Sequence, residues 1–236
     1  MRLETKRNLT CPNPLANFEI HLIKLGNPRL DESAVATRLK QLFDRVIREG
    51  HVSGYQEAHI QWPQACPTSL PPDQLLVYVV QGTSDSVVSN HFRSHDFPEG
   101  AGFTAWDDSA TASEVYVSGC DGNGPGVANM IFHEAMHNKG HWSDAQLHGT
   151  FGGGGLASAS VSRITELNAI NIQRMAGVLA ARRPQWIGGC SYFNDPLRGL
   201  GADNLLLRGS REAYGLADAG GAVRGHSYRP GPRGLA

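Results

Sequence analysis

Hydrophobic and polar positions predict alternating strands and helices in the first half of the chain. Residues 18–25 (FEIHLIKL) alternate apolar and polar side chains, which is typical of a strand. Residues 31–48 carry apolar side chains at helical spacing behind an acidic first turn, so we expect a helix there. Further strands are expected at residues 57–62, 75–80 and 114–118. The second of these (LLVYVV) is apolar throughout and should be covered on both faces.

The rest of the pattern predicts loops and two more helices. Residues 81–112 are polar and irregular, and residues 141–163 form a second expected loop. Helices are expected at residues 127–138, stopped by Gly140, and at residues 165–182. The order of elements predicts an α/β (α+β) fold, with an α/β lobe followed by a smaller, mostly helical and irregular lobe.

The length of 236 residues suits one domain. Within it, we expect residues 1–140 to form an upper lobe that includes the helix at 127–138. Residues 141–225 should form a lower lobe, and residues 226–236, rich in Gly and Arg, a flexible tail.

Composition narrows the class of function. With 40% hydrophobic and 18% charged residues, the chain can bury a core and is not of the disordered type. The formal net charge of −1 argues against nucleic acid or an anionic membrane as a partner. No apolar run is long enough to span a bilayer, and no apolar stretch of signal-peptide length follows the basic N-terminus. We therefore expect a cytoplasmic location or export by a non-standard route.

The four cysteines are widely spaced and form no Cys-x-x-Cys pair. An even number permits two disulfides or four free thiols, and both states stay open. They are Cys11, Cys66, Cys120 and Cys190.

The candidate chemistry lies in residues 131–149 (IFHEAMHNKGHWSDAQLHG), which contain His133-Glu134-x-x-His137. Residues four apart lie above one another on a helix, so the two imidazoles can reach one metal ion. Glu134 is turned about 100° away from His133 and is better placed as a general base beside a metal-bound water than as a ligand. Imidazole ligands with a neighbouring carboxylate base suit Zn²⁺. The apolar residues on the opposite side of this helix should face the core and leave the histidines in a cleft: Ala128, Ile131 and Ala135.

A catalytic zinc site needs a third protein ligand, and three residues downstream are candidates. We prefer His148, eleven residues after His137, and keep Asp144, seven residues after it, as the alternative. His141 continues the four-residue spacing, but three histidines on a straight helix span about 12 Å. It qualifies only if the chain bends sharply at Gly140. If His148 binds the ion, Asp144 could instead orient a ligand imidazole.

This segment resembles the zincin metallopeptidases, whose two helix histidines and intervening glutamate match His133, His137 and Glu134. The resemblance implies a zincin-like fold with a mixed sheet, in which an edge strand binds an extended protein or peptide substrate and the motif helix forms the floor of the cleft. Gly140 fits the glycine of the metzincin subgroup, while the position of that subgroup's third ligand holds Ser143. Residues 148–151 (HGTF) are more similar to the His-Gly-x-x-Phe that carries the third ligand in SprT-type (Spartan-like) proteases.

Four other features have more than one interpretation. The glycine run 152–155 suits a flexible flap or a nest of backbone donors near the cleft. The strand at 114–118 is either the substrate-pairing edge or an ordinary sheet strand. His91 and His95 form a second pair four residues apart, which is a weaker candidate for a metal site. Three tyrosines are candidate oxyanion donors or ordinary packing residues: Tyr192, Tyr214 and Tyr228.

The sequence therefore favours a zinc metalloendopeptidase with His133, His137 and His148 as ligands and Glu134 as base. A second hypothesis is a non-catalytic binding module stabilised by zinc with a fourth protein ligand, although a structural site needs no base. A third is a secreted or delivered bacterial effector or toxin, whose toxicity on expression should disappear with Glu134→Ala. The oligomeric state stays open.

Overall fold

The computed structural model describes residues 15–63, 70–71, 73–86, 88, 100–106 and 111–182, and the backbone of a strand at 224–227. It has a six-stranded mixed sheet with the strand order β2-β1-β3-β5-β4-β6. Four neighbouring strands are parallel: β2 (Tyr55–Gln61), β1 (Ala16–Lys24), β3 (Leu75–Val80) and β5 (Thr111–Tyr116). The other two are β4 (Gly102–Trp106), antiparallel to β5, and β6 (Arg224–Ser227), antiparallel to β4. The expected α/β fold with a mixed sheet is confirmed.

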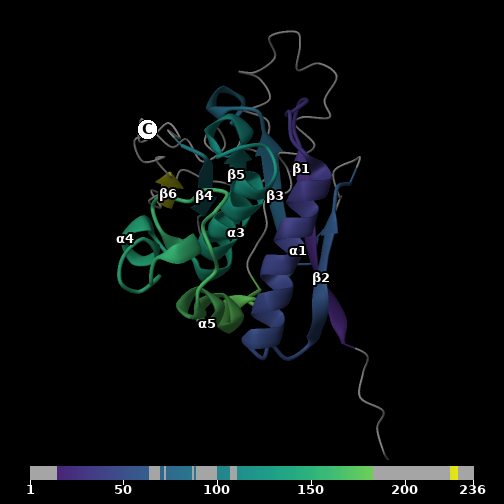
Figure 1. Cartoon of the computed structure of the whole chain (residues 1–236), viewed down its shortest axis with the longest axis vertical. Helices are drawn as coiled ribbons and strands as arrows, with labels where there is room; N and C mark the ends of the chain where they lie inside the picture. The colour runs from purple at the N-terminus through teal and green to yellow at the C-terminus, as the bar shows by residue number, and fades with distance from the viewer. Residues whose placement is uncertain are drawn as a thin grey trace, which may run out of the picture.

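Three long helices and one short one have their bounds within the described residues, and the long ones cover one face of the sheet (Figure 1). They are α1 (Glu32–Glu49), α3 (Pro125–Gly140), the short α4 (Asp144–Leu147) and α5 (Ala169–Val178). Single 3₁₀ turns lie at η1 (Thr83–Asp85), η2 (Val117–Gly119) and η3 (Gly155–Ala157). None of the helices in the described part of the chain has the length and apolar character of a bilayer span.

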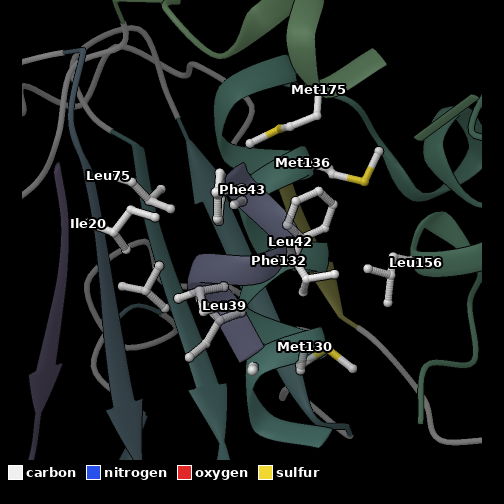
Figure 2. Close-up of a cluster of buried hydrophobic side chains, with 14 of the residues drawn as sticks. Ile20, Leu39, Leu42, Phe43, Leu75, Met130, Phe132, Met136, Leu156 and Met175 are labelled. Carbon is white, nitrogen blue, oxygen red and sulfur yellow. The ribbon is translucent and has the colours of Figure 1, made fainter. Parts of the chain in front are cut away.

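The main core lies between this face of the sheet and the three long helices (Figure 2). Ile20 and Leu75 contribute from the sheet, and Phe43 of α1 packs against Phe132 of α3 with 5.0 Å between ring centroids. Met175 of α5 belongs to the same core and lies near Met136 of α3, because α5 packs against α1 and α3. A second apolar cluster lies on the opposite face of the sheet and includes Tyr78, Phe103 and Tyr116. The central strands are therefore buried on both faces.

Strand β4 was not expected from the sequence, which predicted irregular structure over residues 81–112. All five of its residues (GFTAW) are buried, because one face meets α3 and the other joins the second cluster. Alternation of apolar and polar residues, the usual signature of a strand, is absent when both faces are covered. Since β4 lies outside β5, the second of the two interpretations of residues 114–118 holds: they belong to an ordinary sheet strand and not to an edge.

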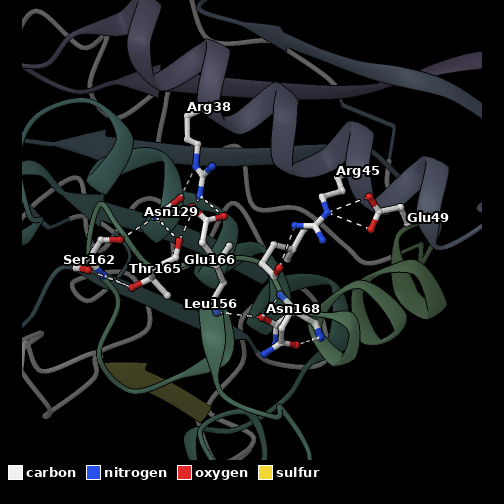
Figure 3. Close-up of polar contacts among 11 residues, drawn as sticks. Arg38, Arg45, Glu49, Asn129, Leu156, Ser162, Thr165, Glu166 and Asn168 are labelled. Carbon is white, nitrogen blue, oxygen red and sulfur yellow. Dashed lines mark hydrogen bonds and ion pairs between the residues drawn. The ribbon is translucent and has the colours of Figure 1, made fainter.

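Helix α5 begins at Ala169 rather than at residue 165, because Asn168 caps it. The Asn168 side chain accepts a hydrogen bond from the Asn171 amide at 2.9 Å, and the Asn171 side chain accepts one from the Asn168 amide. The residues before this cap are attached to neighbouring helices (Figure 3). Asn129 of α3 donates to the carbonyls of Ser162 and Thr165, and Arg45 of α1 donates to that of Leu167.

Strand β6 lies far along the chain from the other strands. It covers Arg224–Ser227, so the tail that the sequence predicts from residue 226 begins inside a strand. The division into an upper and a lower lobe stays a prediction.

Candidate metal centre

Helix α3 contains the His133-Glu134-x-x-His137 motif and lies in the middle of the molecule. Its residues from Gly126 to Lys139 are all buried, and the imidazoles of His133 and His137 are 0% and 2% exposed. The expectation of an amphipathic helix with its histidines in an open cleft is therefore wrong. The polar residues of α3 are enclosed by β4, β5 and the segments that follow the helix.

The chain reverses direction directly after α3. Gly140 is the last helical residue rather than the residue after the helix, and His141 takes the left-handed conformation with φ of +51°. A Cβ on Gly140 would come within 2.3 Å of the Trp142 ring, so only glycine allows this close return. The reversal brings α4, capped by Ser143, back alongside the end of α3.

Three histidines converge after this reversal. Nε2 of His133 lies 3.2 Å from Nε2 of His137 and 3.2 Å from Nε2 of His148, the residue after α4. All three ligand atoms lie within 4.8 Å of one another, so this triad could hold a metal ion. The sequence preferred these three residues as ligands.

The two helix histidines are oriented by main-chain carbonyls. His133 Nδ1 lies 2.7 Å from the Leu156 oxygen, and His137 Nδ1 lies 2.6 Å from the Trp142 oxygen. A carbonyl can only accept, so each Nδ1 carries a proton and each neutral ring presents an Nε2 lone pair. Two lone pairs 3.2 Å apart repel unless a proton or a cation lies between them. This donor arrangement fits a shared cation.

Burial keeps the first of these rings neutral. It lowers the pKa of His133 to about 3, with a smaller contribution from His148, and the hydrogen bond to Leu156 opposes the shift. Burial also lowers the pKa of His148. Neutral imidazoles are the form that binds metals, so protons compete weakly for this site near neutral pH.

The Leu156 carbonyl is held in place by the glycine run 152–155. Asn171 donates from Nδ2 to the carbonyls of Gly152 and Gly154 at 2.8 and 2.9 Å and accepts from the Leu156 amide at 3.0 Å. Gly153, Gly154 and Gly155 all have positive φ, which side chains with a Cβ rarely adopt. The run is thus a hydrogen-bonded turn that positions the imidazole of His133, which does not favour the flexible flap among the two interpretations of this run.

Glu134 is buried on the side of α3 that faces β4. Its side chain is 1% exposed, and the Thr104 hydroxyl donates to Oε2 at 2.6 Å. Oε1 lies so close to Gly102 that a Cβ there would approach it to 2.3 Å. Burial raises the pKa of Glu134 well above its ordinary value, the Thr104 hydrogen bond opposes this shift, and the charge of Asp144 adds to it. A carboxyl with a raised pKa can accept a proton near neutral pH.

The two alternative ligands have different positions. Asp144 Oδ1 lies 3.7 Å from His137 Nε2 and 3.9 Å from His148 Nε2, so this carboxylate borders the triad. Burial raises the pKa of Asp144 to about 6. His141 instead lies against β4 and β5: its ring stacks on Trp106 at 5.0 Å, and its Nε2 lies 2.8 Å from the Thr111 hydroxyl.

Other sequence candidates lie outside the described residues or away from the triad. His91, His95 and the three tyrosines are outside the described residues, as are Cys11, Cys66 and Cys190. Cys120 is a free thiol, and burial raises its pKa. The free thiol of Cys120 agrees with the alternative of free cysteines. It does not agree with the alternative of two disulfides, because two disulfides among four cysteines would include Cys120.

Sequence reasoning did not find four groups that define the centre: Thr104, Asn171 and the carbonyls of Trp142 and Leu156. Main-chain carbonyls have no sequence signature, and Thr104 lies on the strand that was missed. Asn168 and Asn171 did offer a signal, because asparagine before an apolar helical run is typical of an N-cap.

No protein-family model matches this sequence, and no curated protein is significantly similar to it. The function is therefore argued from the geometry of the centre.

Proposed function

We propose that this chain is a zinc-dependent metallopeptidase that hydrolyses peptide bonds with water and uses Glu134 as its general base. The proposal depends on one observation, the convergence of three imidazole Nε2 atoms beside a buried glutamate on the same helix. Three further features support the proposal: the spacing of the two histidines on the helix, the tautomers that direct Nε2 to the shared site, and the contacts of Glu134 with β4.

Zinc suits this donor set. Ligands bound tetrahedrally at 2.0–2.1 Å from zinc lie about 3.3 Å from one another. The Nε2 of His133 is 3.2 Å from the Nε2 atoms of His137 and His148. Zinc held by three protein ligands keeps an open position, acts as a Lewis acid and makes water nucleophilic near neutral pH.

The chain's own residues supply the proton transfers. Glu134 would take the proton of the attacking water and later return it to the leaving amine. Thr104 holds Oε2, and the missing side chain of Gly102 leaves room for Oε1, so the carboxylate is fixed before substrate binds. No covalent intermediate with the protein is required.

The test compares Glu134→Gln with wild type. Zinc content is measured by mass spectrometry, and hydrolysis is measured as new peptide termini in a library of cell-derived peptides. We expect the variant to fold and keep its zinc, while hydrolysis falls about 10²–10⁴-fold because the base is lost. Glu49→Gln, on the exposed end of α1, is the matched control and should keep full activity. A folded, zinc-loaded Glu134→Gln protein with undiminished hydrolysis would contradict the mechanism.

A second candidate is a non-catalytic module in which zinc only stabilises the fold. The position of Asp144 favours it, because Oδ1 lies within 4 Å of two ligand nitrogens and could complete a four-ligand shell. X-ray absorption of the zinc-loaded protein separates the two functions when wild type and Asp144→Asn are compared. A peptidase should show three imidazoles and an unchanged first shell in the variant. A structural module should show an altered shell and weaker zinc binding in the variant, with no hydrolysis by either protein.

A further inference from the structure

The outer edge of β4 lies next to the proposed general base. Thr104, in the middle of this strand, donates to Glu134, and Gly102 at its start contacts the same carboxylate. A peptide that ran along this edge would therefore pair with the strand that contacts Glu134. An open sheet edge offers unpaired N–H and C=O groups, which are a template for adding an extended peptide as a further strand.

In the structure, this edge is occupied by a distant segment of the same chain. Strand β6 pairs antiparallel with β4 over its whole length, with Ser227 opposite Phe103 and Arg224 opposite Trp106. The backbone of His226 lies opposite Thr104, the residue that holds Glu134. Figure 1 shows β6, in yellow, beside β4 at the end of the sheet.

We infer that Arg224–Ser227 occupies the peptide-binding edge of β4 and competes with substrate, so that the chain inhibits itself. This inference rests on the proposed peptidase function. The main-chain groups on one edge of β4 can pair with only one strand at a time, so β6 and an extended substrate exclude each other. A tethered segment acts at an effective concentration on the order of millimolar, which a dilute substrate must overcome.

Competition for the edge predicts a particular kinetic signature. Weakening β6 should lower KM and leave kcat unchanged, because the substrate then meets a free edge and reacts at an unaltered centre. If β6 had only a structural role, weakening it would not lower KM at an unchanged kcat. Its loss would lower stability or kcat instead.

Proline substitution in the full-length, zinc-loaded protein is the direct test. Neighbouring residues of an antiparallel strand alternate in donating their N–H to the partner strand, so one of Gly225 and His226 donates to β4 and the other does not. Amide hydrogen exchange on wild type identifies the donor as the protected amide. Proline at the donor removes a ladder hydrogen bond, whereas proline at the other position is tolerated on an edge strand and is the matched control.

We expect KM to fall about tenfold in the donor variant, with kcat unchanged, because an intramolecular competitor is lost. The control variant should behave as wild type. The amides of β4 that wild type protects should exchange faster only in the donor variant. Equal KM in all three proteins would overturn the inference, even if β6 proves to be formed.

A binding measurement separates this inference from the peptidase proposal. A fluorescent synthetic peptide with the sequence of residues 221–230 (GAVRGHSYRP) is titrated into Glu134→Gln protein with and without the donor proline. We expect it to bind about tenfold more tightly when proline has freed the edge. If the peptide binds more tightly to the proline variant but none of the proteins hydrolyses any peptide, the peptidase proposal fails and the occupation of the edge by β6 is supported. If hydrolysis occurs but the peptide binds both proteins equally, self-inhibition fails and the peptidase stands.

Discussion

The carbonyls of Leu156 and Trp142 determine which nitrogen of each helix histidine can bind a metal. Each accepts from an Nδ1 and so leaves the Nε2 lone pair of His133 or His137 directed at the shared site. A donor at either position would have put the proton on Nε2 and closed the site to metal. The sequence indicates the histidines by their spacing, but it cannot indicate their tautomers, because these depend on backbone atoms more than 20 residues away for His133.

Replacing Thr104 with valine should change the pH at which the base works. The hydrogen bond from Thr104 lowers the pKa of Glu134, so its loss raises that pKa further. A general base must be ionised, and activity is lost as pH falls through its pKa, so the acid limb of the kcat/KM profile should move to higher pH. The buried Oε2 would also lose its donor, at a cost of about 1–2 kcal/mol in unfolding free energy.

Thr104→Ser keeps the hydroxyl and is the control for that experiment. Its pH profile should match wild type, and its unfolding free energy should change by less than that of the valine variant. An acid limb that stays in place in Thr104→Val would show that this hydrogen bond does not tune Glu134.

At the level of elements, the sequence predicted those with clear helical spacing, strand alternation or an apolar run, including the fully buried β3, and missed β4. Helix α1 has one buried face and an Asp31 cap, and its observed bounds lie within a residue of the expected 31–48. Helix α3 was expected at residues 127–138 with His133 and His137 in a cleft opposite an apolar stripe, but both histidines are buried, and so is Glu134. Strand β4 shows neither alternation nor a long apolar run. Both the burial of α3 and the presence of β4 affect the site, because Glu134 is enclosed between them.

The turn at 152–155 should depend on Asn171. Replacing this buried residue with alanine removes two bonds to glycine carbonyls, one from the Leu156 amide and the capping bond from the Asn168 amide, which should lower the unfolding free energy by about 3 kcal/mol. The Leu156 carbonyl would then orient His133 less well, and zinc affinity should fall about 10–100-fold. Chemical denaturation and metal competition titration measure the two effects.

Asn168→Ser is the matched control for Asn171→Ala. Serine can still cap α5, and only the bond from Asn168 Nδ2 to the Gly153 carbonyl is lost. We expect nearly unchanged zinc affinity in this variant. Equal losses of affinity in both variants would mean that the turn as a whole, and not the contacts of Asn171, orients His133.

In the whole molecule, α3 is fixed by many more core residues than the segment that carries His148. Lys139 is fully buried at the end of α3 and donates to the carbonyls of Asp73, Gln74 and Ala181. These bonds connect α3 to the residues before β3 and to those after α5. The core around Phe132 fixes the same helix. His148 reaches this rigid helix through the reversal at residues 140–142 and the single turn of α4. A bound metal would therefore act as an additional cross-link between a helix in the core and a short segment that Leu147 and His141 anchor.

Removing the metal should consequently loosen residues 141–148 without unfolding the protein. A metal present at about 1,000 times its Kd adds about 4 kcal/mol to stability, which for a chain of this size raises Tm by about 10 °C. We expect chelation to lower Tm by that amount and to speed amide exchange chiefly in residues 141–148, with α3 still protected. His148→Ala should abolish most of the difference between chelated and metal-loaded protein, whereas His59→Ala, an exposed histidine on β2, should leave it intact. The opposite result is that the amides of α3 in the chelated protein exchange as fast as those of residues 141–148. It would show that the core and Lys139 are not sufficient to hold α3, and that folding of the centre requires the metal.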